Sequence, residues 1–178
     1  MMADENVITS AGAATRTARY ATELFIRLKR DPRTIAAAED CRQTFSAMRT
    51  GRSTPKESAT TVRARIQALV LDECALPYQW LVELILHEIT AQLTGAGDES
   101  VTLDAPTLSD IPKGRAPKRG DYQARDIDWF FRNRVLRESA YAIAKADLGR
   151  IGKGHHTVQK AIARVTSALD TLDVDAAC

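Results

Sequence analysis

The sequence is poor in cysteine and has no long apolar run, and each shortage excludes a class of protein. Its three cysteines, Cys41, Cys74 and Cys178, are far apart and form no CxxC pair. Such an odd, sparse set is typical of reduced thiols in a cytosol and indicates neither a disulfide framework nor a zinc site. The most apolar stretch, residues 80–86, is far shorter than the roughly 20 residues that span a bilayer. The N-terminus also lacks the basic start and apolar run of a secretory signal, so we expect a cytoplasmic protein with no membrane partner.

Basic residues are missing from the middle of the chain. Residues 66–112 contain eight acidic residues and no lysine or arginine, whereas residues 1–65 contain 12 basic and 7 acidic residues. Residues 113–178 contain 13 basic and 8 acidic residues, and all 13 basic residues but only 5 of the acidic ones lie between residues 113 and 164. Such a basic excess can neutralise several phosphates and release their counterions. Charge alone leaves two interpretations open, a nucleic-acid interface and a solvated basic face without a partner.

The apolar pattern predicts an all-α protein. A hydrophobic share of 44% is ordinary for a globular chain, and 178 residues suffice for one domain or two small ones. Tyr20, Leu24 and Leu28 predict a helix over residues 13–30, and Asp31-Pro32 is typical of the start of the next helix. The second helix would bury the residues that recur at steps of three and four, namely Ile35, Ala38, Cys41, Phe45 and Met48.

Two more helices are expected in the N-terminal part. After a polar loop over residues 50–58, a third helix would carry Val62, Ile66, Leu69 and Val70, and Pro77 would open a fourth over residues 78–93. The fourth is apolar on nearly every side, which predicts burial in a core or against another subunit. We therefore expect residues 1–95 to form a helical domain for assembly or partner binding, and the chain to be a homo-oligomer through it.

The C-terminal part begins with an expected linker over residues 96–120. It has three prolines and a basic end formed by Lys113, Arg115, Lys118 and Arg119. Three helices should follow in residues 121–178. The first would contain Ile127, Trp129, Phe130, Phe131 and Val135. The second would run from a Ser139 cap through Tyr141 to Leu148 and close at Gly149, and the third from about residue 155 to residue 172.

Three short helices with a glycine-containing turn before the last are typical of a helix-turn-helix domain, whose last helix enters the major groove of DNA. On a helical wheel the third helix separates an apolar face, with Val158, Ala161, Ile162 and Val165, from a polar one. Glutamine can pair with adenine, and histidine or lysine can donate to guanine or phosphate. An ordinary amphipathic surface helix would also have two faces, but no acidic residue occurs between residues 149 and 167. The predicted DNA-contacting residues are Arg150, Lys153, His155, His156, Thr157, Gln159, Lys160 and Arg164, with Arg115, Lys118 and Arg119 of the linker.

The run from Gly152 to Val158 resembles the signature of the C-terminal domain of the bacterial chromosomal replication initiator. In that family a Gly-Arg-Asp-His-Thr/Ser-Thr-Val run forms the turn and the start of the recognition helix. The resemblance implies that His155 and Thr157 stand where the family contacts bases and phosphates, and Lys153 where its arginine stands. Gly154 and His156 depart from the signature, and the turn after Ser139 is longer. The resemblance covers only roughly 25 residues, and the GxxxxGK[ST] loop of the family's ATPase is absent, so it extends to the DNA-reading part alone.

Other interpretations of the same residues are weaker. The three glycines between residues 149 and 154 lack the GK[ST] of a phosphate-binding loop, and no apolar strand precedes them. His155 and His156 could bind a metal, but adjacent helical side chains diverge by about 100°. Trp129, Phe130 and Phe131 could stack on single-stranded bases, but their helical spacing favours a core. No spacing supports a catalytic triad, so we expect neither an enzyme nor a cofactor.

The sequence thus favours a sequence-specific double-stranded DNA-binding protein, in the role of a transcriptional regulator that acts as an oligomer. Two alternatives stay open. The chain could be the DNA-recognition subunit of a phage or mobile element, such as a small packaging or replication-accessory protein. It could also be a protein-interaction module whose basic helix binds an acidic partner.

Overall fold

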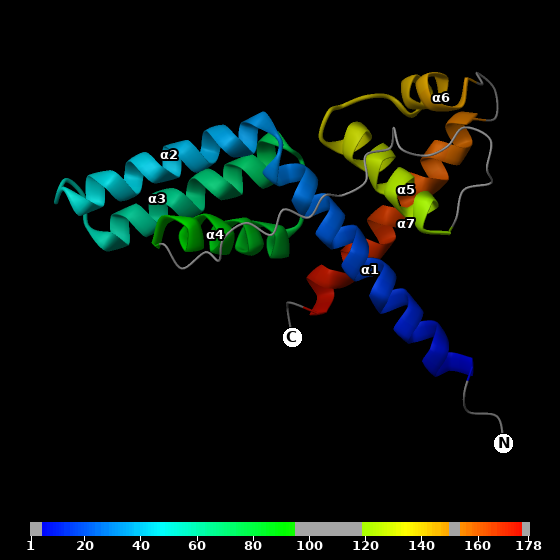
Figure 1. The fold of residues 1–178 in the computed structure, drawn as a ribbon, viewed down its shortest axis with the longest axis horizontal. Helices are drawn as coiled ribbons and strands as arrows, with labels where there is room; N and C mark the ends of the chain where they lie inside the picture. Colours follow the sequence, from blue (N-terminus) through cyan, green and yellow to red (C-terminus); the bar gives the residue numbers. More distant parts are fainter. Residues whose placement is uncertain (1–4, 95–118, 150–153, 176–178) are drawn as a thin grey trace. The chain divides into compact units, whose positions relative to one another are not determined.

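A computed structural model describes the backbone of residues 5–94, 119–149 and 154–175, and the side chains of residues 16–93, 122–149 and 154–172. Every regular element in these ranges is a helix, which confirms the predicted all-α class (Figure 1). In chain order the elements are α1 (Glu5–Lys29), α2 (Pro32–Arg49), α3 (Pro55–Gln67), the π-helix η1 (Ala68–Glu73), α4 (Gln79–Thr94), α5 (Arg119–Arg134), α6 (Ala140–Leu148) and α7 (Gly154–Asp175). None of the helices, over the part described, is long and apolar enough to cross a membrane.

The helices belong to two compact units. Residues 27–105 form the α2–α4 unit, and residues 1–26 join residues 106–178 in the α5–α7 unit. The expected boundary near residue 95 had placed the first helix with α2, whereas most of α1 groups with the C-terminal helices. Arg19 Nη1 of α1 donates a hydrogen bond to Gln123 Oε1 of α5 at 3.4 Å. Regular apolar spacing identifies the face that a helix buries, but not which helices cover it.

Local sequence signals explain where the helices of the α2–α4 unit begin. Asp31 caps α2 by accepting a hydrogen bond from Arg33 N at 2.9 Å, with proline in the first turn as predicted. Thr54 and Glu57 form a capping box at the start of α3, which satisfies backbone N–H groups at both positions. Helix α3 therefore begins at residue 55, and the predicted loop over residues 50–58 is too long.

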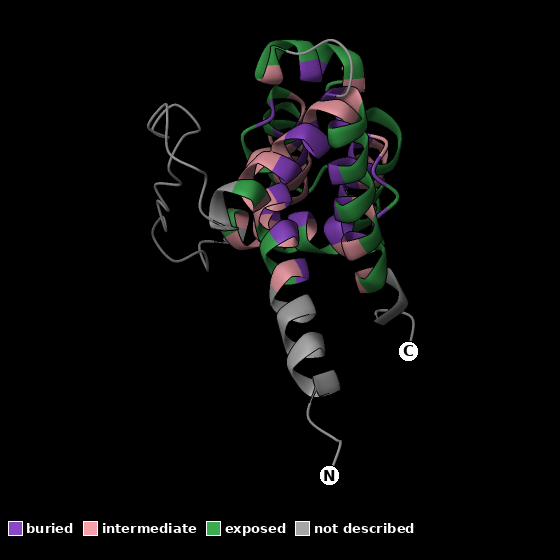
Figure 2. Ribbon diagram, turned by 90° about the vertical axis from the view of Figure 1, so that its right-hand side faces the viewer, coloured by how far each residue is buried: buried purple, intermediate pink, exposed green. Residues whose placement is uncertain are grey.

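The core of the α2–α4 unit lies between helix faces that are buried on one side only. Figure 2 shows the same division into buried and exposed sides on the helices that face the viewer. Val62, Ile66, Leu69 and Val70 are all buried, which confirms the predicted inner face of this segment. The predicted face of α2 is wrong at Ile35, which is 59% exposed. The buried positions of α2 are Thr34, Ala37 and Cys41. The first two lie one residue before the predicted positions, and Cys41 is buried as predicted.

Helix α4 is less completely buried than its composition suggested. Leu81, Val82, Ile85 and Ile89 face the core, but Leu84 on the opposite side is 39% exposed. The remaining predicted apolar positions, Trp80 and Leu86, are half-buried. The outer face of α4 thus presents apolar surface within a unit that already has a closed core.

Ion pairs within the α2–α4 unit neutralise much of the acidic middle segment. Its acidic residues on η1 and α4 pair with basic residues of α1 and α3, in the contacts Arg65–Glu73 at 2.6 Å, Arg63–Glu83 at 2.7 Å and Lys29–Glu88. The hydrogen bonds from Arg63 and Lys29 hold the pKa of Glu83 and Glu88 below its usual range. Much of the basic excess of residues 1–65 is therefore used in contacts inside this unit.

The α5–α7 unit has a core built from the predicted apolar residues of all three helices. Helix α5 buries Ile127, Trp129, Phe130, Phe131 and Val135, helix α6 buries Ile143 and Ala144, and helix α7 buries Val158, Ala161, Ile162, Val165 and Leu169. Tyr20 and Leu24 of α1 are buried as well. Tyr141, an apolar position of the same predicted helix, is 48% exposed.

Candidate nucleic-acid interface

Helix α6 begins and ends at the residues that the sequence predicted. Ser139 Oγ accepts a hydrogen bond from Ala142 N at 3.1 Å and caps the start of α6. Gly149 closes α6 with a φ of 60°, a left-handed conformation that glycine adopts without a steric penalty. Helix α7 then begins at Gly154. Both predicted signals at the ends of α6 are confirmed.

The inner face of α7 is fixed by packing. The four residues of its predicted apolar face are buried together with Leu169, and α7 packs against both α5 and α6. Burial of a valine, isoleucine or leucine side chain contributes about 1.5–3 kcal/mol relative to leaving it exposed. The four such residues of this face, Val158, Ile162, Val165 and Leu169, determine which side of α7 faces outward. The rotation of α7 about its own axis is therefore set by the core.

The outer face of α7 carries polar side chains over its first turns. His156, Thr157, Gln159 and Lys160 are exposed, and His155 is partly exposed. The rings of His155 and His156 stack with centroids 3.9 Å apart and planes at 37°. We expected these adjacent side chains to point in different directions, but their rings lie against each other. Across the described residues, no three histidine, cysteine or acidic side chains are grouped so that they could hold a metal ion.

Arg164 differs from the other predicted contact residues because its guanidinium is already engaged. Arg164 Nη1 donates to Asp126 Oδ2 of α5 at 2.7 Å, and the Asp126 side chain is only 1% exposed. Burial raises the pKa of Asp126, and the positive charges of Arg164 and Arg125 oppose this rise. Arg164 therefore holds α7 to α5, and its contact with a phosphate would compete with this pair.

Arg125 contributes to the same region through aromatic contacts. Its guanidinium carbon lies 4.8 Å from the ring centroid of Tyr122 and 4.5 Å from that of Trp129. Contacts of this kind are favourable because the ring faces carry negative potential. Trp129, Phe130 and Phe131 are buried, so the interpretation of these residues as a core is correct and the base-stacking interpretation is wrong.

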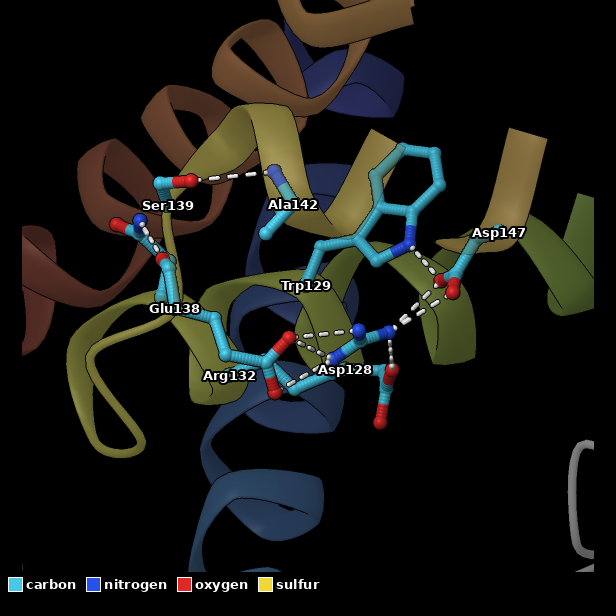
Figure 3. Close-up of polar contacts among 8 residues, drawn as sticks. Asp128, Trp129, Arg132, Glu138, Ser139, Ala142 and Asp147 are labelled. Atoms are coloured by element: carbon cyan, nitrogen blue, oxygen red, sulfur yellow. Dashed lines mark hydrogen bonds and ion pairs between the residues drawn. The ribbon is translucent and has the colours of Figure 1, made fainter. Parts of the chain in front are cut away.

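A cluster of carboxylates around Arg132 joins α5 to α6 (Figure 3). Arg132 contacts Glu138 at 2.7 Å, Asp147 at 2.9 Å and Asp128 at 3.9 Å. Asp147 also accepts a hydrogen bond from Trp129 Nε1 at 2.7 Å. The hydrogen bond to Glu138 is the largest cause that raises the pKa of Arg132 above its usual range, and Asp147 adds to it. The cluster fixes three acidic side chains against one arginine.

Several predicted contact residues lie outside the described part of the chain. Arg115 and Lys118 of the expected linker, and Arg150 and Lys153 of the turn before α7, are among them. Arg119 begins α5, but its side chain is not described. Their roles stay predictions.

Sequence reasoning missed three exposed basic side chains, at the end of α5, in the turn that follows it and on α6. Arg134, Arg137 and Lys145 are exposed, and no ion pair involves them among the side chains that are described. The count of basic residues between 113 and 164 included them, but could not tell which arginines are paired with carboxylates. That distinction depends on contacts between residues up to 38 positions apart, such as Asp126 and Arg164.

Comparison of the chain with known protein families, with curated protein sequences and with solved structures gave no match. The resemblance of residues 152–158 to the replication initiator signature therefore stays a prediction.

Proposed function

We propose that the chain binds double-stranded DNA by placing the first turns of α7 in the major groove. The observation that carries the proposal is the outer face of α7, where His156, Thr157, Gln159 and Lys160 are exposed on a helix whose other face is locked into a core. The major groove is about 12 Å wide and admits an α-helix. Glutamine, histidine and lysine are residue types that bind base edges and phosphates.

The distribution of charge supports the same partner. In the α2–α4 unit, many basic side chains are paired with carboxylates, as the contacts of Arg63, Arg65 and Lys29 illustrate. In the described part of α5–α7, the acidic side chains before α7 lie against Arg132 or Arg164, whereas no ion pair involves Lys145 or Lys160. The surface next to α7 thus keeps basic groups that are free to neutralise phosphates, and neutralisation drives association by counterion release.

The role that we propose is a transcriptional regulator that occupies a DNA site as an oligomer. Helix-turn-helix dimers bind half-sites about 34–36 Å apart, so a second copy adds a second recognition helix. The outer face of α4 is our proposed contact between copies, because Leu84 is 39% exposed and Trp80 beside it is only half-buried. Sedimentation of the chain at micromolar concentration tests this part, and a monomer at that concentration contradicts it.

Selection from a random duplex library tests the DNA-binding proposal. The full chain is incubated with the library, bound duplexes are recovered, and the enriched sequences are compared with the input. We expect enrichment of a short motif, because direct readout by α7 discriminates each contacted base pair by about 1–3 kcal/mol. Binding without enrichment contradicts sequence-specific recognition, and failure to recover any duplex contradicts the proposal as a whole.

A further inference from the structure

The pair of Asp126 and Arg164 joins an exposed cation of α7 to a buried carboxyl group of α5. The Arg164 side chain is 51% exposed, whereas the Asp126 side chain is 1% exposed. Arg164 Nη1 donates to Asp126 Oδ2 at 2.7 Å. Asp126 Oδ1 has no hydrogen-bond partner among the described residues, and Arg125 Nη2 lies 3.6 Å from it. Arg164 therefore supplies the direct hydrogen bond to this buried group.

Arg164 also lies beside the outer face of α7 that we propose to meet the duplex. Lys160 and Arg164 are four residues apart on the helix, so their side chains are neighbours with Cβ atoms about 5–6 Å apart. Lys160 is exposed and belongs to the proposed DNA-binding face. A phosphate bound by Lys160 would therefore lie close to Arg164. The position of Arg164 on the helix does not keep it from DNA, but its contact with Asp126 opposes such a role.

Asp126 can compete with phosphate for Arg164 because it is buried. Charge attraction is screened less by water and salt at a buried group than at a surface. Moving Arg164 onto a phosphate would also leave the buried carboxyl group without its hydrogen bond, a penalty that a solvated phosphate does not carry. Arg125 is held elsewhere, since its guanidinium carbon lies 4.5 Å from the ring centroid of Trp129 and 4.8 Å from that of Tyr122. The internal pair should therefore persist when α7 binds DNA.

We propose that Asp126 limits the affinity of α7 for DNA by holding Arg164 away from the phosphates of the duplex. The inference rests on the proposed function, and it treats Lys160 as engaged with DNA and Arg164 as withheld from it. Asp126 is a positioning residue, because it acts through Arg164 and does not itself contact the duplex. Removal of the charge on Asp126 should consequently release one further cation to the DNA and strengthen binding.

A double-mutant cycle on the full chain tests the inference with the parent, Asp126→Asn, Arg164→Gln and the double variant. Affinity for a duplex of mixed sequence is measured over a series of salt concentrations at about pH 8, which favours the ionised form of the carboxyl group. Asp126→Asn should raise the slope of log affinity against log salt by about one, and Arg164→Gln alone should leave it unchanged. The double variant should return to the parent slope, because the gain passes through Arg164. A fourfold increase in salt should reduce the gain in affinity by about 3.5-fold.

The matched control is Asp170→Asn, which removes the same charge from an exposed position on α7. It should change the salt slope much less than Asp126→Asn does. Equal gains from the two substitutions would show an effect of net charge and overturn the inference. Circular dichroism melts establish that each variant is folded at the temperature of the titrations. A change in melting temperature without a change in the salt slope would assign Asp126 a purely structural role, which also contradicts the inference.

The Arg164→Gln variant keeps the inference falsifiable even if Asp126→Asn does not fold. A slope that falls by about one in this variant would show that Arg164 already binds a phosphate in the parent chain, and would overturn the inference. An unchanged slope supports it. Duplex binding by the parent with an unresponsive cycle would remove this inference alone, whereas absence of duplex binding by the parent would remove the proposed function as well.

Discussion

At the scale of single residues, the pair of Asp126 and Arg164 is the contact whose effect on stability should depend most clearly on pH. Asp126 is 1% exposed, and burial raises its pKa. A carboxyl whose pKa is raised by folding stabilises the protein fully below its unfolded pKa of about 3.9, and this contribution is lost as pH rises through the folded pKa. Arg164 opposes this rise in pKa because its positive charge favours the ionised form of the buried carboxyl.

Arg164→Ala should consequently destabilise the protein by about 1–3 kcal/mol at neutral pH, because it leaves the buried carboxylate without its hydrogen-bonded cation. The deficit should shrink in mildly acidic solution as Asp126 becomes protonated. Urea unfolding of parent and variant at the two pH values measures this difference. The double variant Arg164→Ala/Asp126→Asn should be more stable at neutral pH than Arg164→Ala alone. A deficit of the same size at both pH values would contradict the assignment.

Two neighbours on the outer face of α7 should differ in what they contribute to DNA binding. Gln159→Ala should flatten preference at one base pair, at a cost of about 1–3 kcal/mol, because it removes a paired contact with a base edge. Lys160→Ala should instead weaken binding to all sequences and lower the salt slope by about one. Both side chains are exposed, so neither change should alter melting. Library selection with each variant measures preference. If Gln159→Ala selects the same motif with the same stringency, α7 does not read that base.

At the scale of elements, two adjacent positions on α7 separate its supporting face from its outer face. Val158 is fully buried and Thr157 is exposed. Val158→Asp should destabilise the α5–α7 unit by about 3 kcal/mol or more, since it buries an unpaired charge. Thr157→Asp adds the same charge near the start of the helix, where it should be tolerated, but it should weaken duplex binding by repelling phosphate. Circular dichroism melts and duplex titrations distinguish the two. Equal melting of both variants would show that α7 is rotated from the orientation described.

Helix ends were the most predictable features, because their signals are local in sequence. Asp31-Pro32, Ser139 and Gly149 each satisfy or shape backbone groups within a few residues, and each is placed as expected. The inner face of α2 was less predictable, because Cys41 fits two overlapping patterns. The pattern from Ile35 reaches it in two steps of three, and the pattern from Thr34 reaches it in a step of three and a step of four. Thr34 and Ala37 are buried, so packing in the folded unit selects the second pattern.

The candidate interface was predictable only in part, because some of its features depend on contacts with distant residues. The buried face of α7 follows from apolar spacing, so the exposure of Gln159 and Lys160 follows too. Whether an arginine is available for DNA depends on partners elsewhere in the chain. Arg164 meets a carboxylate 38 positions away, whereas Arg137 meets none in the described part, and no local rule distinguishes them.

At the scale of the whole molecule, residues far apart in sequence build one unit. Tyr20 of α1 is buried, and burial raises the pKa of its hydroxyl. The charges of Asp126 and Arg164 also act on this pKa, in opposite directions. Tyr20→Ala should therefore destabilise the α5–α7 unit, by about 3 kcal/mol for a large aromatic side chain. Each unit has one tryptophan, Trp80 in one and Trp129 in the other, so Trp80→Phe leaves a reporter for the α5–α7 unit alone. Tyr20→Ala in that background should lower the midpoint of the Trp129 transition. An unchanged midpoint would contradict the grouping of α1 with α5–α7.

Because most of α1 groups with α5–α7, the proposed duplex binding is best measured on the full chain. The most direct test of the account is the affinity of that chain for duplex DNA over a series of salt concentrations. Log affinity should fall linearly with log salt, with a slope of about 0.9 for each neutralised phosphate. A slope equivalent to several phosphates is the result that we predict. Undetectable duplex binding, or an affinity that does not change between low and moderate salt, would contradict the proposal that this protein binds DNA.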